Sequence, residues 1–314
     1  MKMFKELTLL SLLLGMPVVG LAAPLEQQLS IERGQVKAHV GIYEAKTERV
    51  LGDILYFHGY GDHFKNHEQL FQSWNERGFR VVAFDLPSHG GTKSLWDLDC
   101  YSFSDLAKLA AEVDSRVLVD RNRPFFLAGW SMGGLLATRI GQSADLQKLF
   151  ERKIQGLFLY APGVSVYPCV GRACFITNDT LTHDPGLQNR TFSPATPITR
   201  IHFAASLLFN GYLARQQMIP IEIPAVVFIG GDREDAYAKT PELKNWIRQQ
   251  RKWQNGAGGQ SVITFQCTGA FHELDNESTE FGGPQVRAIS GMLAEAFVQG
   301  MPGPIAEGPC KQIE

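Results

Sequence analysis

The sequence predicts an α/β fold in which helices cover both faces of a mostly parallel central sheet. Two observations predict it: short apolar runs that end in glycine-rich turns recur along the chain, and segments with helical periodicity separate them. Continuous apolar runs of this length are typical of strands buried on both faces. Their alternation with helices indicates right-handed crossovers between parallel strands.

Six apolar runs are predicted to form the parallel strands, and each leads into a turn. One further run, Val36–Tyr43, is predicted to add an antiparallel strand at the start of the sheet. The six runs are residues 53–57, 80–84, 125–128, 155–160, 225–229 and 261–266.

Two helices have clear start signals. Ser102 and Asp105 form a possible capping box, and apolar residues then recur at helical spacing as far as Val117. Pro284 is suited to the first turn of a last helix, whose apolar face extends to Phe297. These helices fit between the predicted strands or after the last of them.

The interval 163–224 contains no clear buried strand and interrupts this alternation. We expect a lid at about residues 164–222, with a helical segment at about 197–217. The alternative is an insertion that packs only on itself. Residues 23–314 are otherwise predicted to form one domain.

The first 22 residues resemble a secretory signal peptide. Lys2 and Lys5 precede an apolar run, and small residues around Ala22 suit a cleavage site. The alternative, an uncleaved anchor helix, would be short for a membrane span. We therefore expect no transmembrane segment in the mature chain, and an exported protein that is periplasmic or secreted.

The composition excludes some classes of partner. The 314 residues include 30 basic and 32 acidic side chains, a net charge of −2, which provides no basic surface for nucleic acid. The cysteines show no metal-site spacing, since there is no C-x-x-C and no neighbouring pair of histidines, and we expect no metal. The oligomeric state stays open.

The five cysteines are an odd number, so at least one is free or pairs with another chain. Export would permit disulfides. Cys169 and Cys174 enclose only four residues, and we expect a bond between them.

The clearest chemical signal is the G-x-S-x-G motif around Ser131. It directly follows a predicted strand and directly precedes a predicted helix, which is the context that a nucleophile elbow requires. Such a turn presents the serine hydroxyl at the N-terminus of a helix, where developing negative charge is stabilised. Ser131 is therefore the predicted nucleophile.

A serine nucleophile needs a base, and the base should follow the last strand. Of the eight histidines, His272 meets this condition, because a short loop separates it from the run 261–266. His58 and His89 are interpreted as structural residues of their loops. The alternative for His272 is a surface histidine without a catalytic role.

The base needs a carboxylate, and three acids follow the run Ala225–Ile229. Asp232 lies at the turn itself and is the preferred acid, with Asp235 next and Glu234 as a further rival. The chain order of serine, acid and histidine is that of α/β hydrolases. For the oxyanion we expect the backbone N–H groups of Met132 and Tyr60.

At these residues the chain resembles the α/β-hydrolase branch of monoacylglycerol lipases and bacterial lysophospholipases, the serine aminopeptidase S33-like enzymes. The resemblance covers roughly residues 53–163 and 225–296. It rests on FHGYGDH, GFRVVAFDLPSHGGT, GWSMGG and GAFHELDNE. Ser88 stands where the branch usually has glycine, Trp130 where it often has histidine, and GGDRED matches loosely around the acid.

The resemblance implies an α/β-hydrolase fold with a lid, no cofactor, and hydrolysis of a carboxylic ester through an acyl-serine. The expected substrate is a small lipid-like ester, a lysophospholipid or a monoacylglycerol. Ile201, Leu208 and Tyr212 share one predicted helical face of the lid and would contact the acyl chain, unless that face packs on the core. Alternatives are a proline-iminopeptidase-like peptidase and a non-catalytic binding protein.

Overall fold

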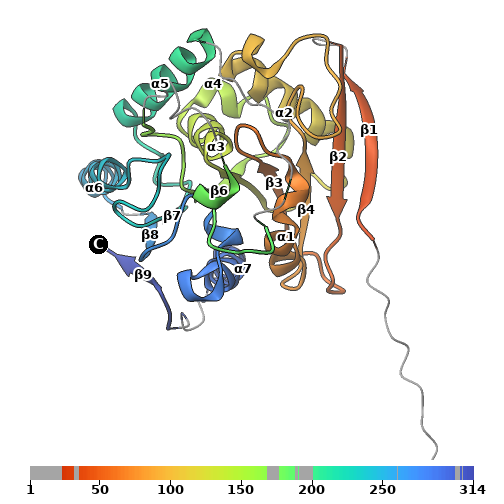
Figure 1. Cartoon of the computed structure of the whole chain (residues 1–314). Coiled ribbons are helices and arrows are strands. Elements are labelled where there is room, and N and C mark those ends of the chain that lie inside the picture. The colour runs from red at the N-terminus through yellow and green to blue at the C-terminus, as the bar shows by residue number, and fades with distance from the viewer. Residues whose placement is uncertain are drawn as a thin grey trace, which may run out of the picture.

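A computed structural model describes most of the chain (Figure 1). The described residues are 23–31, 35–167, 177–187, 190, 201–259, 261–300, 305 and 307–314. The predicted signal peptide at 1–22 and the predicted Cys169–Cys174 bond lie outside them.

The predicted sheet is confirmed, and in the described residues it has nine strands in the order β1-β2-β4-β3-β5-β6-β7-β8-β9. All neighbours from β4 to β8 pair in parallel, whereas β1, β2 and β9 pair antiparallel at the two edges. The edge strands β1 and β9 were not predicted from the sequence. The strands are β1 (Leu25–Ile31), β2 (Val36–Tyr43), β3 (Gly52–Phe57), β4 (Phe79–Phe84), β5 (Phe125–Trp130), β6 (Ile154–Tyr160), β7 (Ala225–Ile229), β8 (Val262–Cys267) and β9 (Cys310–Ile313).

Helices cover both faces of this sheet, as Figure 1 shows. Side chains of α1 and α7 belong to the apolar core on one face, and those of α2, α3 and α6 belong to the core on the other. The helices are α1 (Glu68–Asn75), α2 (Phe103–Val117), α3 (Met132–Gln142), α4 (Ala144–Gln147), α5 (Ile201–Gln216), α6 (Thr240–Gly256) and α7 (Gly283–Gln299).

Strand β3 shows why the parallel strands are apolar throughout. Leu55 and Phe57 lie in one core, whereas Ile54 and Tyr56 lie in the other, and all four are fully buried. Because successive side chains of a strand point to opposite faces, a strand covered on both sides has no polar face.

The start of α2 confirms the predicted capping box. The Asp105 N–H donates to the Ser102 hydroxyl, and the Ser102 N–H donates to the Asp105 carboxylate. These two bonds satisfy backbone donors that the helix itself leaves unpaired.

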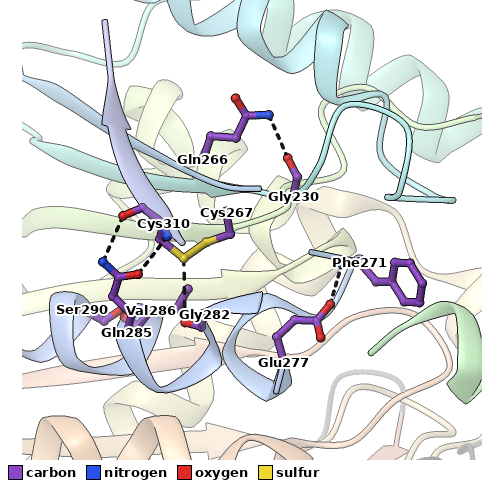
Figure 2. Close-up of a disulfide and its surroundings, with 10 residues drawn as sticks. All are labelled: Gly230, Gln266, Cys267, Phe271, Glu277, Gly282, Gln285, Val286, Ser290 and Cys310. Carbon is purple, nitrogen blue, oxygen red and sulfur yellow. Dashed lines mark hydrogen bonds between the residues drawn. A yellow bond between two sulfur atoms is a disulfide. The ribbon is translucent and has the colours of Figure 1, made fainter. Parts of the chain in front are cut away.

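A disulfide joins Cys267 at the end of β8 to Cys310 at the start of β9 (Figure 2). The Gln285 side chain of α7 donates to the Cys310 carbonyl at 3.0 Å and accepts from its N–H at 2.8 Å. The disulfide and these two hydrogen bonds therefore hold β9 against the end of β8 and against α7. Cys267 lies five residues before His272, so β9 is attached close to the loop that carries this histidine. Among the described cysteines, Cys100 is a free thiol.

In the interval predicted as a lid, the described residues form loops, a short 3₁₀ helix η5 (Asn178–Thr180) and the helix α5. Helix α5 packs against α3, and its buried Phe203 joins the core. No helix in the described part of the chain is long and apolar enough to cross a bilayer.

Candidate active site

Ser131 occupies a sharp turn between β5 and α3. Its φ is 53° and its ψ is −116°, a backbone conformation that is strained for a residue with a side chain. A Cβ on Gly133 would lie 2.1 Å from the Phe57 carbonyl oxygen, and a Cβ on Gly129 would lie 2.5 Å from the Gly133 backbone. The glycines therefore permit the close approach of β5, α3 and the end of β3 that presents Ser131.

His272 lies in the loop after β8 and reaches Ser131. Its Nε2 is 2.8 Å from the Ser131 Oγ, and the histidine is almost fully buried. The Trp130 indole N–H donates to the His272 carbonyl at 2.9 Å, which holds the loop against the end of β5. The predicted pairing of Ser131 with His272 is thus present in the structure.

The acid beside His272 is Asp235, and the preference for Asp232 was wrong. The His272 Nδ1 is 3.0 Å from the Asp235 Oδ2, and both side chains are buried. Asp232 instead pairs with Lys244 at 2.5 Å, and its side chain is 54% exposed. Its carboxylate therefore does not contact His272.

The path of the loop explains this difference. The Gly231 N–H donates to the Ala270 carbonyl at 2.9 Å, so the chain stays beside the loop after β8 for two residues beyond β7. Asp232 consequently turns toward α6 and Gln266, whose amide donates to it at 3.1 Å. The turn toward His272 is completed three residues later, at Asp235.

Two N–H groups hold the Asp235 carboxylate. Tyr237 and Ala238 donate to its Oδ1 at 2.9 and 2.8 Å, which leaves Oδ2 directed at His272. This short Asx-type turn after the acid is a sequence-local feature that could have favoured Asp235. The arrangement requires the His272 Nδ1 to donate, so Nε2 is the acceptor for the Ser131 hydroxyl.

The loop after β3 lies directly against the nucleophile. A Cβ on Gly59 would lie 2.5 Å from the Trp130 ring and 3.3 Å from the Ser131 Cβ. Tyr60 follows, and its ring stacks on Phe203 of α5 at 5.6 Å. Met132 is the first residue of α3, whose N–H has no partner within the helix. Both amides are therefore in chain segments that border Ser131.

His58 and His89 give this loop its shape. The Leu86 N–H donates to the His58 Nε2 at 2.8 Å, and the Gly61 N–H donates to the His89 Nε2 at 3.0 Å. Burial lowers the pKa of His58 and lowers that of His89 to about 3. Both rings are thus neutral acceptors that fix the backbone, as expected for structural histidines.

Helix α5 presents its predicted substrate face to the outside. Leu208 and Tyr212 are 43% and 51% exposed, whereas Phe203, Gly211 and Ala214 are buried. The side chain of Ile201 lies outside the described residues. The alternative prediction, that Leu208 and Tyr212 pack on the core, is therefore wrong. Their contact with an acyl chain stays a prediction.

Leu208 also lines a cavity of about 240 Å³ between α5 and the segment that follows β6. Arg215, Lys239 and the segment from Gly163 to Val166 also line it. The Gly163 N–H donates to the Ser131 carbonyl at 2.7 Å, so one segment that lines the cavity is bonded to the nucleophile turn.

One group of described residues has the composition of a metal site. The ligand atoms of Asp62, His67 and Glu273 lie within 4.8 Å of one another. Both ring nitrogens of His67 already face carboxylates, and Glu273 pairs with Arg190 at 2.7 Å. Arg190 thus neutralises Glu273, and both ring nitrogens of His67 are already engaged by Asp62 and Asp275. His67 therefore has no free lone pair for a metal.

Comparisons with known proteins show which families and sequences the chain resembles. Residues 48–183 match the family described as serine aminopeptidase, S33. Phospholipase YtpA of Bacillus subtilis is 24% identical over 254 residues, which cover 74% of this chain and 92% of that protein. A candidate monoglyceride lipase of Schizosaccharomyces pombe is 27% identical over 123 residues, 38% of this chain, and the chain spans about a third (32%) of its length.

Solved structures show the same fold. A soluble variant of the monoglyceride lipase of Saccharomyces cerevisiae superposes with a TM-score of 0.68 at 15% identity, over 88% of this chain and 96% of that one. The monoacylglycerol lipase of Paleococcus ferrophilus superposes with a TM-score of 0.65 at 17% identity, over 83% and 99%.

The chain therefore has the α/β-hydrolase fold. Its sequence is similar to the serine aminopeptidase S33 family and to lipase and phospholipase relatives, which is the branch that its motifs resemble.

Proposed function

We propose that this protein is a serine hydrolase that cleaves carboxylic esters through an acyl-serine intermediate. The observation that carries the proposal is the chain of hydrogen bonds from Asp235 through His272 to Ser131. A buried carboxylate that orients a histidine, which in turn faces a strained serine, is the arrangement that activates a serine hydroxyl.

In the proposed reaction, His272 accepts the Ser131 proton at Nε2 while the Oγ attacks the ester carbonyl. Asp235 stabilises the imidazolium that forms. The amides of Met132 and Tyr60 are the proposed donors to the oxyanion, because their chain segments border Ser131. His272 then protonates the leaving alcohol, and water releases the acid by the reverse sequence.

For the substrate we propose a lysophospholipid or a monoacylglycerol-like ester. The exposed Leu208, Phe209 and Tyr212 of α5 support a lipid-like substrate, because an apolar surface on a helix beside the active-site loops suits an acyl chain. The names of the relatives, a phospholipase and a candidate monoglyceride lipase, support the same class.

A substrate panel tests this proposal. We expect hydrolysis of p-nitrophenyl esters and of either lysophosphatidylcholine or monoacylglycerol, and loss of both activities in Ser131→Ala. Hydrolysis of proline naphthylamide, together with no hydrolysis of any ester in the panel, would favour the iminopeptidase alternative. A folded protein inactive on the whole panel, and not labelled at Ser131 by a fluorophosphonate, would refute the hydrolase.

We also propose that the protein is exported. The disulfide between Cys267 and Cys310 supports this, because such bonds persist in oxidising compartments. We expect an N-terminus at Ala23 when the protein is purified from the exported fraction and sequenced. Retention of Met1 in that fraction would instead indicate an uncleaved anchor.

A further inference from the structure

A buried histidine that the proposed reaction does not use lies against Trp130, the residue that precedes Ser131. His67 ends the 3₁₀ helix η2 (Phe64–His67), and its side chain is fully buried. Its Nε2 is 2.7 Å from the Asp62 Oδ2, and its Nδ1 is 2.7 Å from the Asp275 Oδ2. Both carboxylates are themselves buried.

This geometry makes His67 a cation. A neutral imidazole donates from one nitrogen only, so a carboxylate at hydrogen-bond distance from each ring nitrogen favours the form with both nitrogens protonated. Burial opposes the charge, but Asp275 and Asp62 outweigh it and raise the pKa of His67 to about 10. The pKa of Asp62 is correspondingly lowered, since the nearby His67 cation outweighs the effect of burial.

The two carboxylates belong to the two loops that the proposed chemistry requires. Asp62 follows Tyr60 by two residues, and Asp275 follows His272 by three. A neutral bond joins the same loops, because the Asn276 amide donates to the Asn66 carbonyl at 2.7 Å. His67 therefore connects the segment of the proposed oxyanion donor to the segment of the proposed base.

The segment that carries the nucleophile also contacts His67, through Trp130. The rings of His67 and Trp130 lie 5.5 Å apart, and those of Trp130 and His272 lie 5.2 Å apart. Trp130 directly precedes Ser131, and its indole N–H donates to the His272 carbonyl. A shift of His67 would thus be transmitted to all three segments.

We propose that His67 is a positioning residue, whose bonds to Asp62 and Asp275 hold the Tyr60 and His272 loops in the geometry that the ester reaction requires. This inference rests on the proposed function. A purely structural role makes a different prediction, because weaker anchoring would then lower stability and leave the turnover of each folded active site unchanged. A displacement of about 1 Å in a reacting group can cost about a hundredfold in rate.

Another buried ion cluster in the same molecule supplies the control. Arg152 pairs with Asp53 and Asp114, and all three side chains are buried. Asp53 lies near the start of β3, whereas the Tyr60 loop follows the end of this strand. The Arg152 cluster is therefore at the opposite end of the parallel strands from the Tyr60 loop. Asp114→Asn therefore weakens a buried ion pair away from Ser131.

The test compares Asp275→Asn and Asp62→Asn with Asp114→Asn. Asparagine keeps the shape of each side chain and an oxygen that accepts from His67, but removes the charge. Active sites are counted by fluorophosphonate titration, and kcat and KM for a p-nitrophenyl ester are measured well below each melting temperature. Inhibition by an aryl trifluoromethyl ketone, which needs the nucleophile and the oxyanion donors together, is measured beside them.

We expect both loop variants to lose kcat about tenfold to a hundredfold, with KM within threefold and the inhibition constant raised by a similar factor. Asp114→Asn should lower the melting temperature and keep kcat within twofold. Equal kcat per titrated site in the loop variants and the wild type would overturn the inference while leaving the hydrolase intact.

A measurement on the wild type covers the case in which the loop variants do not fold. The ¹⁵N resonances of His67, recorded up to pH 8.5 in protein with labelled histidine, should report two protonated ring nitrogens. A neutral His67 at pH 7 would overturn the inference. An absence of any esterase activity or Ser131 labelling in the wild type would instead refute the proposed function.

Discussion

Replacing Asp235 by asparagine should reverse the proton arrangement of His272. The Asp235 Oδ1 accepts two N–H groups, from Tyr237 and Ala238, and only an oxygen can fill that place. The new amide nitrogen must therefore occupy the position of Oδ2, 3.0 Å from the His272 Nδ1.

An amide nitrogen there donates, so the His272 Nδ1 must accept and Nε2 must carry the proton. That Nε2 faces the Ser131 Oγ at 2.8 Å and can no longer accept its proton. In a comparable triad this tautomer costs about 10⁴ in kcat. We expect a loss of that order in Asp235→Asn, with little change in KM.

Asp232→Asn is the matched control three residues earlier. It removes an exposed ion pair with Lys244, a type of contact worth about 0–1 kcal/mol, and touches no part of the proposed triad. We expect its kcat to stay within twofold. Both variants are assayed with a p-nitrophenyl ester and counted by active-site titration. A hundredfold loss in Asp232→Asn beside an active Asp235→Asn would refute the assignment of the acid.

Three further outcomes follow from the structure. Ser131→Ala should fold normally and lose kcat by about 10⁶, and a purified variant that keeps a few per cent of activity would contradict the nucleophile. Cys310→Ser should lower the free energy of unfolding by about 4 kcal/mol in denaturant titration, because the bond to Cys267 closes a long loop; equal stability would mean that the bond is absent. Gly133→Ala should reduce stability by about 1–3 kcal/mol, since its Cβ would meet the Phe57 carbonyl oxygen, and an unchanged melting curve would contradict this close approach.

Features that depend on near neighbours in the chain could be predicted from the sequence. A strand buried on both faces is apolar throughout, so the parallel strands were visible as runs of residues. The elbow at Ser131 was visible because its glycines are required by backbone contacts on either side of it. His272 was visible because a short loop joins it to the last parallel strand.

The acid could not be chosen in the same way. Asp232 and Asp235 are three residues apart, and both lie in the loop after β7. Which of them reaches His272 depends on the bond between Gly231 and Ala270, 39 positions further along the chain. The Asx-type turn that Asp235 makes is local in the chain, but the same loop contains other acids, so the sequence alone did not show which of them makes it.

The orientation of α5 was also undetermined, because apolar residues occur on every side of this helix. Its contact with α3 buries Phe203 and Ala214, and leaves Leu208 and Tyr212 exposed. A helical period identifies a buried face only when the opposite face is polar.

The sequence by itself therefore determined the α/β fold, the elbow at Ser131 and the place of His272, since each follows from local periodicity or backbone conformation. Only the tertiary structure decided that Asp235 orients His272, that Cys267 pairs with Cys310, and that His67 joins two loops. His67 and Asp275 are 208 positions apart. Their contact forms because the segment after β3 and the segment after β8 lie at the same end of the parallel strands. Side chains of this kind become partners only when the folded sheet brings its loops together, because residue type alone does not specify which distant group neutralises a buried charge.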